Sequence, residues 1–405
     1  MNHPRPRLLP LFRRRGRRDE NEVSISPGSL RIHSAFEGGN VEGAQVVGPG
    51  HVQFAAGTGT SPRPLWFYFC LEDAAVPAVR CDLVNADRCF GPREGWANAR
   101  PVFSADGEHW QRVARAEYVQ EGDAPGQFSF TVPVVGPRTF VAYCYPYTTV
   151  PLLALIRELP NRQGIQVGEL CRTVENRTVP YLRFGNHSTP RRAAWVLARQ
   201  HAGESPASFA VEGMIRQFSR LEAPVLEWLA ETALHIIPMV DMDGVFHGRY
   251  GKDERPVDFN RDWSDQPSRP EIAALGRAIA ASASKQRPGL ILDLHASHNG
   301  DTSCYLFGST REQRGAGRPD GEERFARLLA EEAGALGFRE MDLRPGQNAD
   351  GSARQYLSRR YDVPVLTVEL SYHLSHGGTY LAPPDYREFG AALARAAGRY
   401  LRLEE

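Results

Sequence analysis

The pattern of apolar and polar positions changes near residue 150 and divides the chain into two parts. Up to Tyr147, short runs rich in β-branched and aromatic residues alternate with Gly, Pro and Asp turns; the clearest runs are 64–70, 78–84 and 139–144. Short strands at close intervals, with turn residues between them, are typical of a β-sandwich. No amphipathic helix interrupts this pattern. We therefore predict an N-terminal antiparallel β-sandwich over residues 23–147.

In the second part, residues 148–405, strand periodicity alternates with helical periodicity. Ser205-Pro206 is typical of a helix start, because serine caps the first turn and proline needs no partner for an N–H there. Such alternation predicts an α/β domain with helices on both faces of its sheet. We expect strands at 194–199, 234–240, 289–294 and 363–370, and helices at 205–218, 269–284, 322–336 and 384–403.

Two histidines and two acidic residues lie at or near the ends of these predicted strands. They are His201, followed by Glu204, then His295 and Glu369. Ligands of α/β sheets bind beyond the carboxyl ends of the strands, so we expect these side chains to meet. Two imidazoles and one carboxylate are the ligand set of a catalytic zinc, which keeps a fourth position for water. We predict that His201, Glu204 and His295 bind one Zn²⁺ per chain and that Glu369 is the general base.

Each of these residues also has a more ordinary interpretation. A single histidine at a strand end is commonly a hydrogen-bonded structural residue, and a buried Glu369 could belong to a structural ion pair. The pattern His-x-x-Glu is short and carries little weight alone. The shared position at strand ends favours the metal site, and Asp293, two residues before His295, could orient the metal ligands.

Composition excludes some functions. The 48 basic and 48 acidic residues of the 405-residue chain cancel, so no global charge favours nucleic acid or an anionic membrane as a partner. No apolar run is long enough to span a bilayer. Six scattered cysteines without a CxxC pair indicate thiols of a reducing compartment, and we predict a cytoplasmic protein. Residues 1–22 are expected to form a disordered basic tail.

Five motifs in order resemble those of the zinc carboxypeptidases of the M14 (carboxypeptidase A-like) class. They are HAGE at 201–204, DMDG at 241–244, DFNRDW at 258–263, DLH at 293–295 and VELSY at 368–372. Three earlier segments, 36–40, 66–69 and 140–148, resemble the N-terminal β-sandwich of the cytosolic carboxypeptidases, which directly precedes the peptidase domain in that subfamily. The resemblance implies a carboxypeptidase A-like α/β/α domain with a mixed central sheet after the sandwich.

The resemblance assigns the same roles to the metal ligands and to Glu369 as the residues themselves do. It further implies that Asp258 supports the first zinc histidine and that Asn260 and Arg261 bind the substrate's C-terminal carboxylate. Amide and guanidinium groups side by side suit that task, although alone they would also fit an ordinary surface loop. Arg249 is the implied match to the arginine that polarises the scissile carbonyl. Arg354 matches an arginine at the base of the specificity pocket, which suits an acidic side chain.

The chain departs from the family pattern at several positions. The segment 241–244 replaces Asn-Pro-Asp-Gly, which we expect to change a turn more than the chemistry. Ala296-Ser297-His298 stands where the subfamily has Gly-His-Ser, which alters the wall near the metal. Tyr356 and Tyr372 are both candidates for the tyrosine that many members fold over the substrate.

These observations predict a zinc metallocarboxypeptidase that removes C-terminal, preferentially acidic, residues from peptides or proteins. No nucleic acid or membrane partner is expected, and the sequence makes no prediction about oligomeric state. Two alternatives remain. M14-like amidohydrolases, which deacylate small amino-acid derivatives, share the ligand set but lack the sandwich. A non-catalytic binding protein on the same fold would be favoured by loss of a ligand or of the base, yet all four residues are present.

Overall fold

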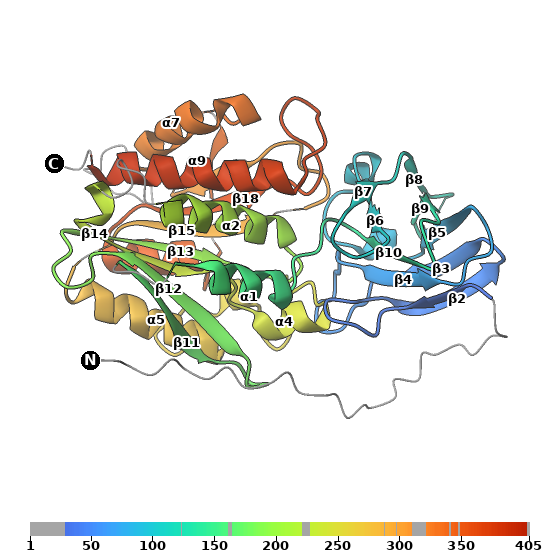
Figure 1. Ribbon diagram of the computed structural model, residues 1–405, viewed down its shortest axis with the longest axis horizontal. Coiled ribbons are helices and arrows are strands. Elements are labelled where there is room, and N and C mark those ends of the chain that lie inside the picture. Colours follow the sequence, from blue (N-terminus) through green and yellow to red (C-terminus); the bar gives the residue numbers. More distant parts are fainter. Residues whose placement is uncertain are drawn as a thin grey trace.

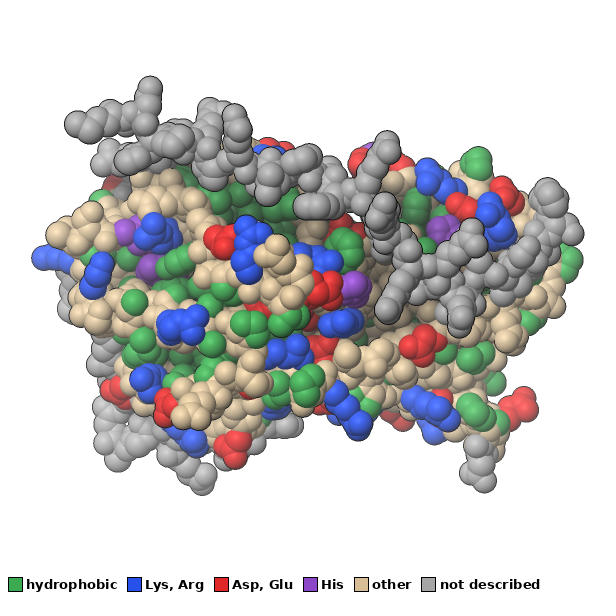
Figure 2. All heavy atoms as spheres, turned by 90° about the horizontal axis from the view of Figure 1, so that it is seen from below, with side chains coloured by type: hydrophobic (Ala, Val, Ile, Leu, Met, Phe, Trp, Pro, Cys, Tyr) green, Lys and Arg blue, Asp and Glu red, His purple; other side chains and the backbone are tan. Residues whose placement is uncertain are grey.

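A computed structural model describes residues 29–122, 124–160, 164–220, 227–286, 288–296, 298–309, 321–339, 342–346 and 349–402. The predicted basic tail, residues 1–22, lies outside the described residues. The rest forms two lobes side by side, a smaller all-β lobe and a larger lobe in which helices cover a sheet (Figure 1). Lys, Arg, Asp and Glu side chains gather along the line where the lobes meet, on the face shown in Figure 2.

The N-terminal lobe consists of two five-stranded sheets. The first has the order β1 (Arg31–His33), β4 (Tyr68–Glu72), β10 (Arg138–Ala142), β6 (Val102–Ser104) and β7 (Gln111–Arg112). The second has the order β2 (Glu42–Gly48), β3 (His51–Ala55), β5 (Ala78–Leu83), β9 (Gln127–Pro133) and β8 (Ala116–Val119). All pairs are antiparallel except β3 and β5, which run parallel. The predicted antiparallel sandwich is confirmed.

The core of this lobe is aromatic. One predicted strand begins four residues further along the chain than expected, because the residues before it lie at the interface between the lobes. Phe54, Phe67 and Phe130 are buried and in ring contact. β4 begins at Tyr68 rather than at residue 64. The preceding Trp66 is buried, donates a hydrogen bond from Nε1 to the backbone oxygen of Gly38 (2.9 Å), and packs against the position of Gly203 in the other lobe. A hydrophobic run used as an interface has the same composition as a strand, so sequence alone did not separate the two.

The described part of the C-terminal lobe contains one mixed sheet of eight strands. Their order is β11 (Ile165–Arg172), β12 (Thr178–Gly185), β14 (Thr232–Ile237), β13 (Arg192–Ala198), β15 (Pro288–Ala296), β18 (Val365–Leu370), β16 (Tyr305–Gly308) and β17 (Leu343–Pro345). The central strands β14, β13, β15 and β18 are parallel to one another and almost wholly buried. This arrangement confirms the predicted mixed sheet.

Helices cover both faces of this sheet (Figure 1). The helices α2 (Ser205–Arg220), α9 (Pro383–Arg402) and α7 (Gly321–Ala333) pack together on one face, and α5 (Pro270–Ala283) lies on the other, against β11. Further helices are α1 (Thr149–Glu158), α4 (Met242–His247) and α8 (Ala353–Tyr361). Among the described residues, no helix combines the length and apolar character that a membrane span requires.

The eight predicted elements of this lobe are present with shifted ends, whereas several others were not predicted. The unpredicted elements include edge strand β11, whose residues are mostly exposed, and α4, which is only six residues long. Neither element buries a continuous apolar face, so neither gives a strong periodic signal. The predicted helix 322–336 ends at Ala333 and continues as a short 3₁₀ turn, Gly334–Leu336.

Candidate active site

The three predicted metal ligands meet in the interior of the C-terminal lobe. His201 Nδ1 lies 2.9 Å from Glu204 Oε1, and His295 Nδ1 lies 2.7 Å from Glu204 Oε2. The two Nδ1 atoms are 3.2 Å apart. All three side chains are buried, and one candidate ligand atom from each lies within 4.8 Å of the others. The chain therefore converges on one point with two ring nitrogens and a carboxylate.

Parallel strands produce this convergence. His201 follows the end of β13, Glu204 immediately precedes α2, and His295 is the penultimate residue of the neighbouring strand β15. Glu369 is the penultimate residue of β18 and stands directly opposite His295 in the parallel register. Because parallel strands end at the same edge of the sheet, residues nearly a hundred positions apart in sequence reach one site.

Carboxylates hold the outward nitrogens of both histidines. His201 Nε2 lies 3.0 Å from Asp258 Oδ1, and His295 Nε2 lies 3.0 Å from Asp293 Oδ2. Asp258 is itself fixed by backbone N–H groups of Asn260 (2.7 Å) and Asp253 (2.9 Å). An acceptor at Nε2 keeps the proton there and turns the Nδ1 lone pair toward a metal.

A buried amide fixes the second supporting carboxylate. Gln200 Nε2 donates to both oxygens of Asp293 at 2.8 Å, and Trp263 Nε1 donates to Gln200 Oε1 at 2.8 Å. Sequence reasoning missed Gln200 because its position before His201 carries no motif. Its role is visible only once β13 and β15 are side by side.

The charges of the site favour a cation. Burial lowers the pKa of His201, but the carboxylates of Asp258 and Glu204 outweigh burial and raise it to about 9. Burial opposes the charge on Glu204, yet His201, His295 and Lys252 keep its pKa well below the usual value. Two imidazole nitrogens and an ionised carboxylate facing one point, each histidine supported by a further acid, fit a zinc ion.

Glu369 lies beside this cluster with an unused oxygen. Its side chain is buried, and Oε2 has no hydrogen-bond partner among the described residues. Burial raises the pKa of Glu369 to about 7, with Lys252 and His295 opposing the shift and Glu204 and Asp301 adding to it. A carboxylate that titrates near neutral pH and has a free oxygen is suited to accept and return a proton.

The two residues expected to bind a substrate carboxylate lie next to the metal ligands, on a 3₁₀ turn (Phe259–Arg261). Asn260 is buried, with Nδ2 3.1 Å from His295 Nε2, and its Oδ1 accepts a hydrogen bond from the N–H of Ala353 (2.8 Å). Arg261 is exposed, and its Nη1 donates to the backbone oxygen of Asn260 (2.6 Å). The amide oxygen of Asn260 is thus committed to an internal hydrogen bond, while the guanidinium of Arg261 faces the surface.

The two other predicted arginines make contacts elsewhere. Arg249 Nη1 lies 3.7 Å from the carboxylate of buried Glu254. Arg354 is buried on α8, donates from Nη1 to the backbone oxygen of Gly308 (3.2 Å), and has a pKa lowered by burial. Neither contact reaches His201, Glu204 or His295.

The two candidate tyrosines occupy different environments. Tyr356 donates its hydroxyl to Asp265 (2.9 Å) on the outer side of α8. Tyr372 is buried and in edge contact with Tyr143 of the N-terminal lobe. Among the described residues, neither hydroxyl bonds to His201, Glu204 or His295.

Lys252 is a site residue that sequence reasoning overlooked. Its Nζ lies 3.4 Å from Glu204 Oε1, and its side chain is 13% exposed. The available signal was its rarity, because the chain has only two lysines, Lys252 and Lys285. Lys252 stands eight residues after DMDG and belongs to no motif, so nothing else in the sequence marks it.

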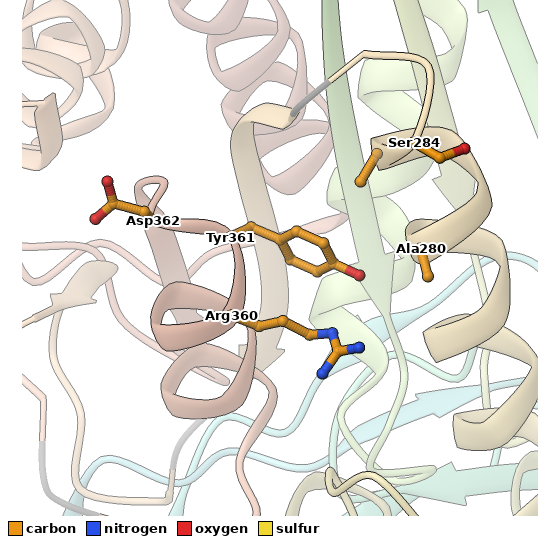
Figure 3. A pocket seen from close by; sticks show the side chains of 6 residues that line it. Ala280, Ser284, Arg360, Tyr361 and Asp362 are labelled. Carbon is orange, nitrogen blue, oxygen red and sulfur yellow. The ribbon is translucent and has the colours of Figure 1, made fainter.

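The pocket in Figure 3 is unrelated to this cluster. It has a volume of about 510 Å³ and lies between the last turn of α5 and the end of α8, where Tyr361 and Arg360 extend toward Ala280. These helix ends lead into the amino ends of β15 and β18, opposite to the ends that carry His295 and Glu369. None of the predicted site residues lines it.

Comparison with known proteins identifies the family. Residues 153–384 match the zinc carboxypeptidase family model, and residues 32–144 match the model of the cytosolic carboxypeptidase N-terminal domain. The chain belongs to the zinc carboxypeptidase family. Human cytosolic carboxypeptidase 6 is 26% identical to this chain, and the match covers 93% of this chain and 79% of the human protein.

Other relatives are longer than the matched region. Zebrafish (Danio rerio) cytosolic carboxypeptidase 2 is 24% identical over 89% of this chain but only 54% of its own length. An uncharacterised Zymomonas mobilis protein is 25% identical over 58% of this chain and 60% of its own length. The chain thus matches little more than half of either protein.

Solved structures share the whole fold of this family member. A metallo-carboxypeptidase from Burkholderia cenocepacia superposes with a TM-score of 0.79 at 23% identity, covering 92% of this chain and 99% of the other. A metallo-carboxypeptidase from Pseudomonas aeruginosa, in complex with (2-guanidinoethylmercapto)succinic acid, gives 0.76 at 23% identity over 92% and 99%. At this identity the match establishes the fold, including the two-lobed arrangement.

Proposed function

We propose that this protein is a zinc-dependent carboxypeptidase that hydrolyses the last peptide bond of peptides or proteins and prefers acidic C-terminal residues. One observation carries the proposal: the buried cluster of His201, Glu204 and His295 has Glu369, with its unused oxygen, in register beside it. The name of the cytosolic carboxypeptidase relatives supports cytoplasmic activity.

His201, Glu204 and His295 would hold one zinc ion per chain. Bound there, zinc would supply the positive charge that makes a water molecule nucleophilic at neutral pH. Asp258 and Asp293 hold the protons of the two histidines at Nε2 and leave both Nδ1 atoms free to bind. Glu369 accepts a proton at Oε2 from the attacking water and returns it to the nitrogen of the leaving amine. Burial keeps the pKa of Glu369 near the value that both transfers need.

The terminal carboxylate would be recognised next to the metal ligands. Arg261 presents an exposed guanidinium at the turn that carries Asn260, and Asn260 contacts His295. A carboxylate paired with this guanidinium leaves only the last peptide bond within reach of the cluster. Arg354, buried on α8, would pair with an acidic C-terminal side chain in a partly desolvated pocket.

Peptides that differ only in the last residue test the proposal. Purified protein loaded with zinc should release Glu faster than Lys or Phe, and a chelator should abolish release until zinc is restored. Glu369→Gln should keep its zinc and lose turnover, because only the proton acceptor is removed. Release that is insensitive to chelator would refute the metal mechanism. Cleavage of N-acyl amino acids without cleavage of peptides would instead identify a deacylase.

A further inference from the structure

The segment Gly248–Arg255 carries Arg249 and Lys252, and only one of these two cationic side chains contacts the cluster of His201, Glu204 and His295. Arg249 interacts with two buried acids, Glu254 and Asp241. Lys252 instead contacts Glu204, with its Nζ 3.4 Å from Glu204 Oε1. The cation that faces the proposed reaction centre is therefore the lysine.

Lys252 acts electrostatically on the groups that the proposed reaction needs. Its ammonium interacts electrostatically with Glu204, with the base Glu369 and with His298. A charge at that position is only partly screened, because the side chain is largely buried and the effective dielectric constant is well below that of water. Negative charge that develops on a substrate oxygen near the cluster would be stabilised by it.

The N-terminal lobe fixes this lysine. Lys252 Nζ lies over the ring of Phe90, 4.5 Å from its centroid, and Arg63 lies over the same ring at 4.7 Å. Phe90 belongs to the β-sandwich lobe, so a residue outside the peptidase lobe holds the cation through its ring face. Such cation–π contacts are stronger when the cation is desolvated.

Further contacts from the same lobe hold the backbone of the segment. Asn40 Nδ2 donates to the oxygen of Gly248 (2.7 Å), and the N–H of Gly251 donates to Ser61 Oγ (3.1 Å). Arg63 Nε donates to Asp253 (3.0 Å). On its other side, Gly251 lies so close to the backbone of the metal-ligand turn that an added Cβ would lie 2.6 Å from the nitrogen of Ala202. The segment is therefore fixed between the sandwich and the turn that carries His201.

We propose that Lys252 is the residue that polarises the scissile carbonyl and stabilises its oxyanion, and that Phe90 positions Lys252 for this role. The inference rests on the proposed carboxypeptidase function and assigns to Lys252 the task that the sequence resemblance implied for Arg249. It also gives the N-terminal lobe a part in catalysis: this lobe fixes the cationic wall of the active site.

Three measurements on the full-length, zinc-loaded protein test the role of Lys252: zinc per chain, kcat and KM for a Glu-ending peptide, and affinity for a phosphinic dipeptide ending in Glu. The phosphinyl group carries negative oxygens in a tetrahedral arrangement, so its affinity reports oxyanion binding without turnover. Lys252→Met should keep its zinc and lose about 10²- to 10³-fold in kcat, with KM little changed. Its affinity for the phosphinate should fall to a similar extent.

Three further variants sharpen the test: one keeps the charge at position 252, one removes the other lysine, and one removes the ring that holds Lys252. Lys252→Arg should recover most of the lost kcat, and Lys285→Met, which removes the other lysine at an exposed turn after α5, should behave like the wild type. Phe90→Leu should lower kcat by about tenfold, as expected for the loss of a desolvated cation–π contact. Melting temperatures check that each variant folds, and the arginine variant remains informative if the methionine variant is unstable.

The outcomes separate the two proposals. If the wild type cleaves and Lys252→Met retains its kcat at full zinc occupancy, Lys252 only neutralises Glu204 and the inference is overturned. The inference is also overturned if Arg249→Met, rather than Lys252→Met, loses kcat and phosphinate affinity. A zinc-loaded wild type that neither cleaves peptides nor binds the phosphinate refutes the proposed function, and the role of Lys252 with it.

Discussion

Replacing Gly251 by alanine should lower the stability of the protein and disturb its proposed zinc site. Gly251 has φ of +89°, and a Cβ built on it would lie 2.6 Å from the nitrogen of Ala202 and 3.0 Å from the Cα of His201. The nearest atoms belong to the backbone, so a side-chain rotation cannot relieve the overlap.

The size of the effect follows from two contributions. An L-residue in the left-handed region costs about 1–2 kcal/mol. Displacing closely packed neighbours costs typically about 1–3 kcal/mol more. Together they should lower the free energy of unfolding by about 3 kcal/mol, which corresponds to roughly 6 °C or more in the melting temperature of a domain of this size. Because the overlap pushes on the turn that carries His201, zinc affinity should fall as well.

Thermal unfolding and zinc titration of Gly251→Ala check this expectation. Gly276→Ala is the matched control, because Gly276 lies within α5, a Cβ there would meet no atom within 4 Å, and alanine favours a helix by about 1 kcal/mol. The control should therefore melt at the same temperature or slightly higher. If Gly251→Ala has the melting temperature and zinc affinity of the wild type, the segment does not lie against the metal-ligand turn as described.

Three further predictions concern the site itself. Asp258→Asn should weaken zinc binding by about 10- to 100-fold, because a neutral amide would replace the carboxylate at His201 Nε2. Competition with a chelator measures the affinity. An unchanged zinc affinity would show that Asp258 does not support His201. Burial raises the pKa of Glu369 to about 7, and this base works only when it is ionised. kcat/KM should therefore fall as pH decreases through an acid limb at or below pH 7, because bound zinc would lower the pKa of Glu369 further. A pH profile that is flat down to pH 4 would contradict this role. Arg354→Met should raise KM for peptides ending in Glu and leave those ending in Phe unaffected, and equal changes for both would remove Arg354 from specificity.

Much of the architecture could be predicted from the pattern of apolar residues, because the central strands are buried. Strands β13, β15 and β18 lie in the centre of the sheet and are covered on both faces. Their sequences are therefore continuous apolar runs that end at polar residues, which is a strong signal. β11 and α4 are exposed or short, so their side chains do not need to follow a burial pattern.

The convergence of the proposed metal ligands was predictable in part. His201, His295 and Glu369 each stand at the end of a buried strand, and parallel strands deliver such ends to one edge. Nothing in the sequence around Gln200 indicated its contact with Asp293, because that contact depends on which two strands are neighbours.

The sequence by itself therefore determined the two-lobed architecture, the family, and the candidate set of metal-binding side chains, because buried strands and short motifs are local properties of the chain. The tertiary structure alone decided which cation faces the cluster. Arg249 and Lys252 are three residues apart in one loop, and local sequence does not distinguish them. Arg249 pairs with Glu254 in its own lobe, whereas Phe90 of the separate N-terminal lobe holds Lys252 close to Glu204, and such long-range packing has no signature in the loop sequence.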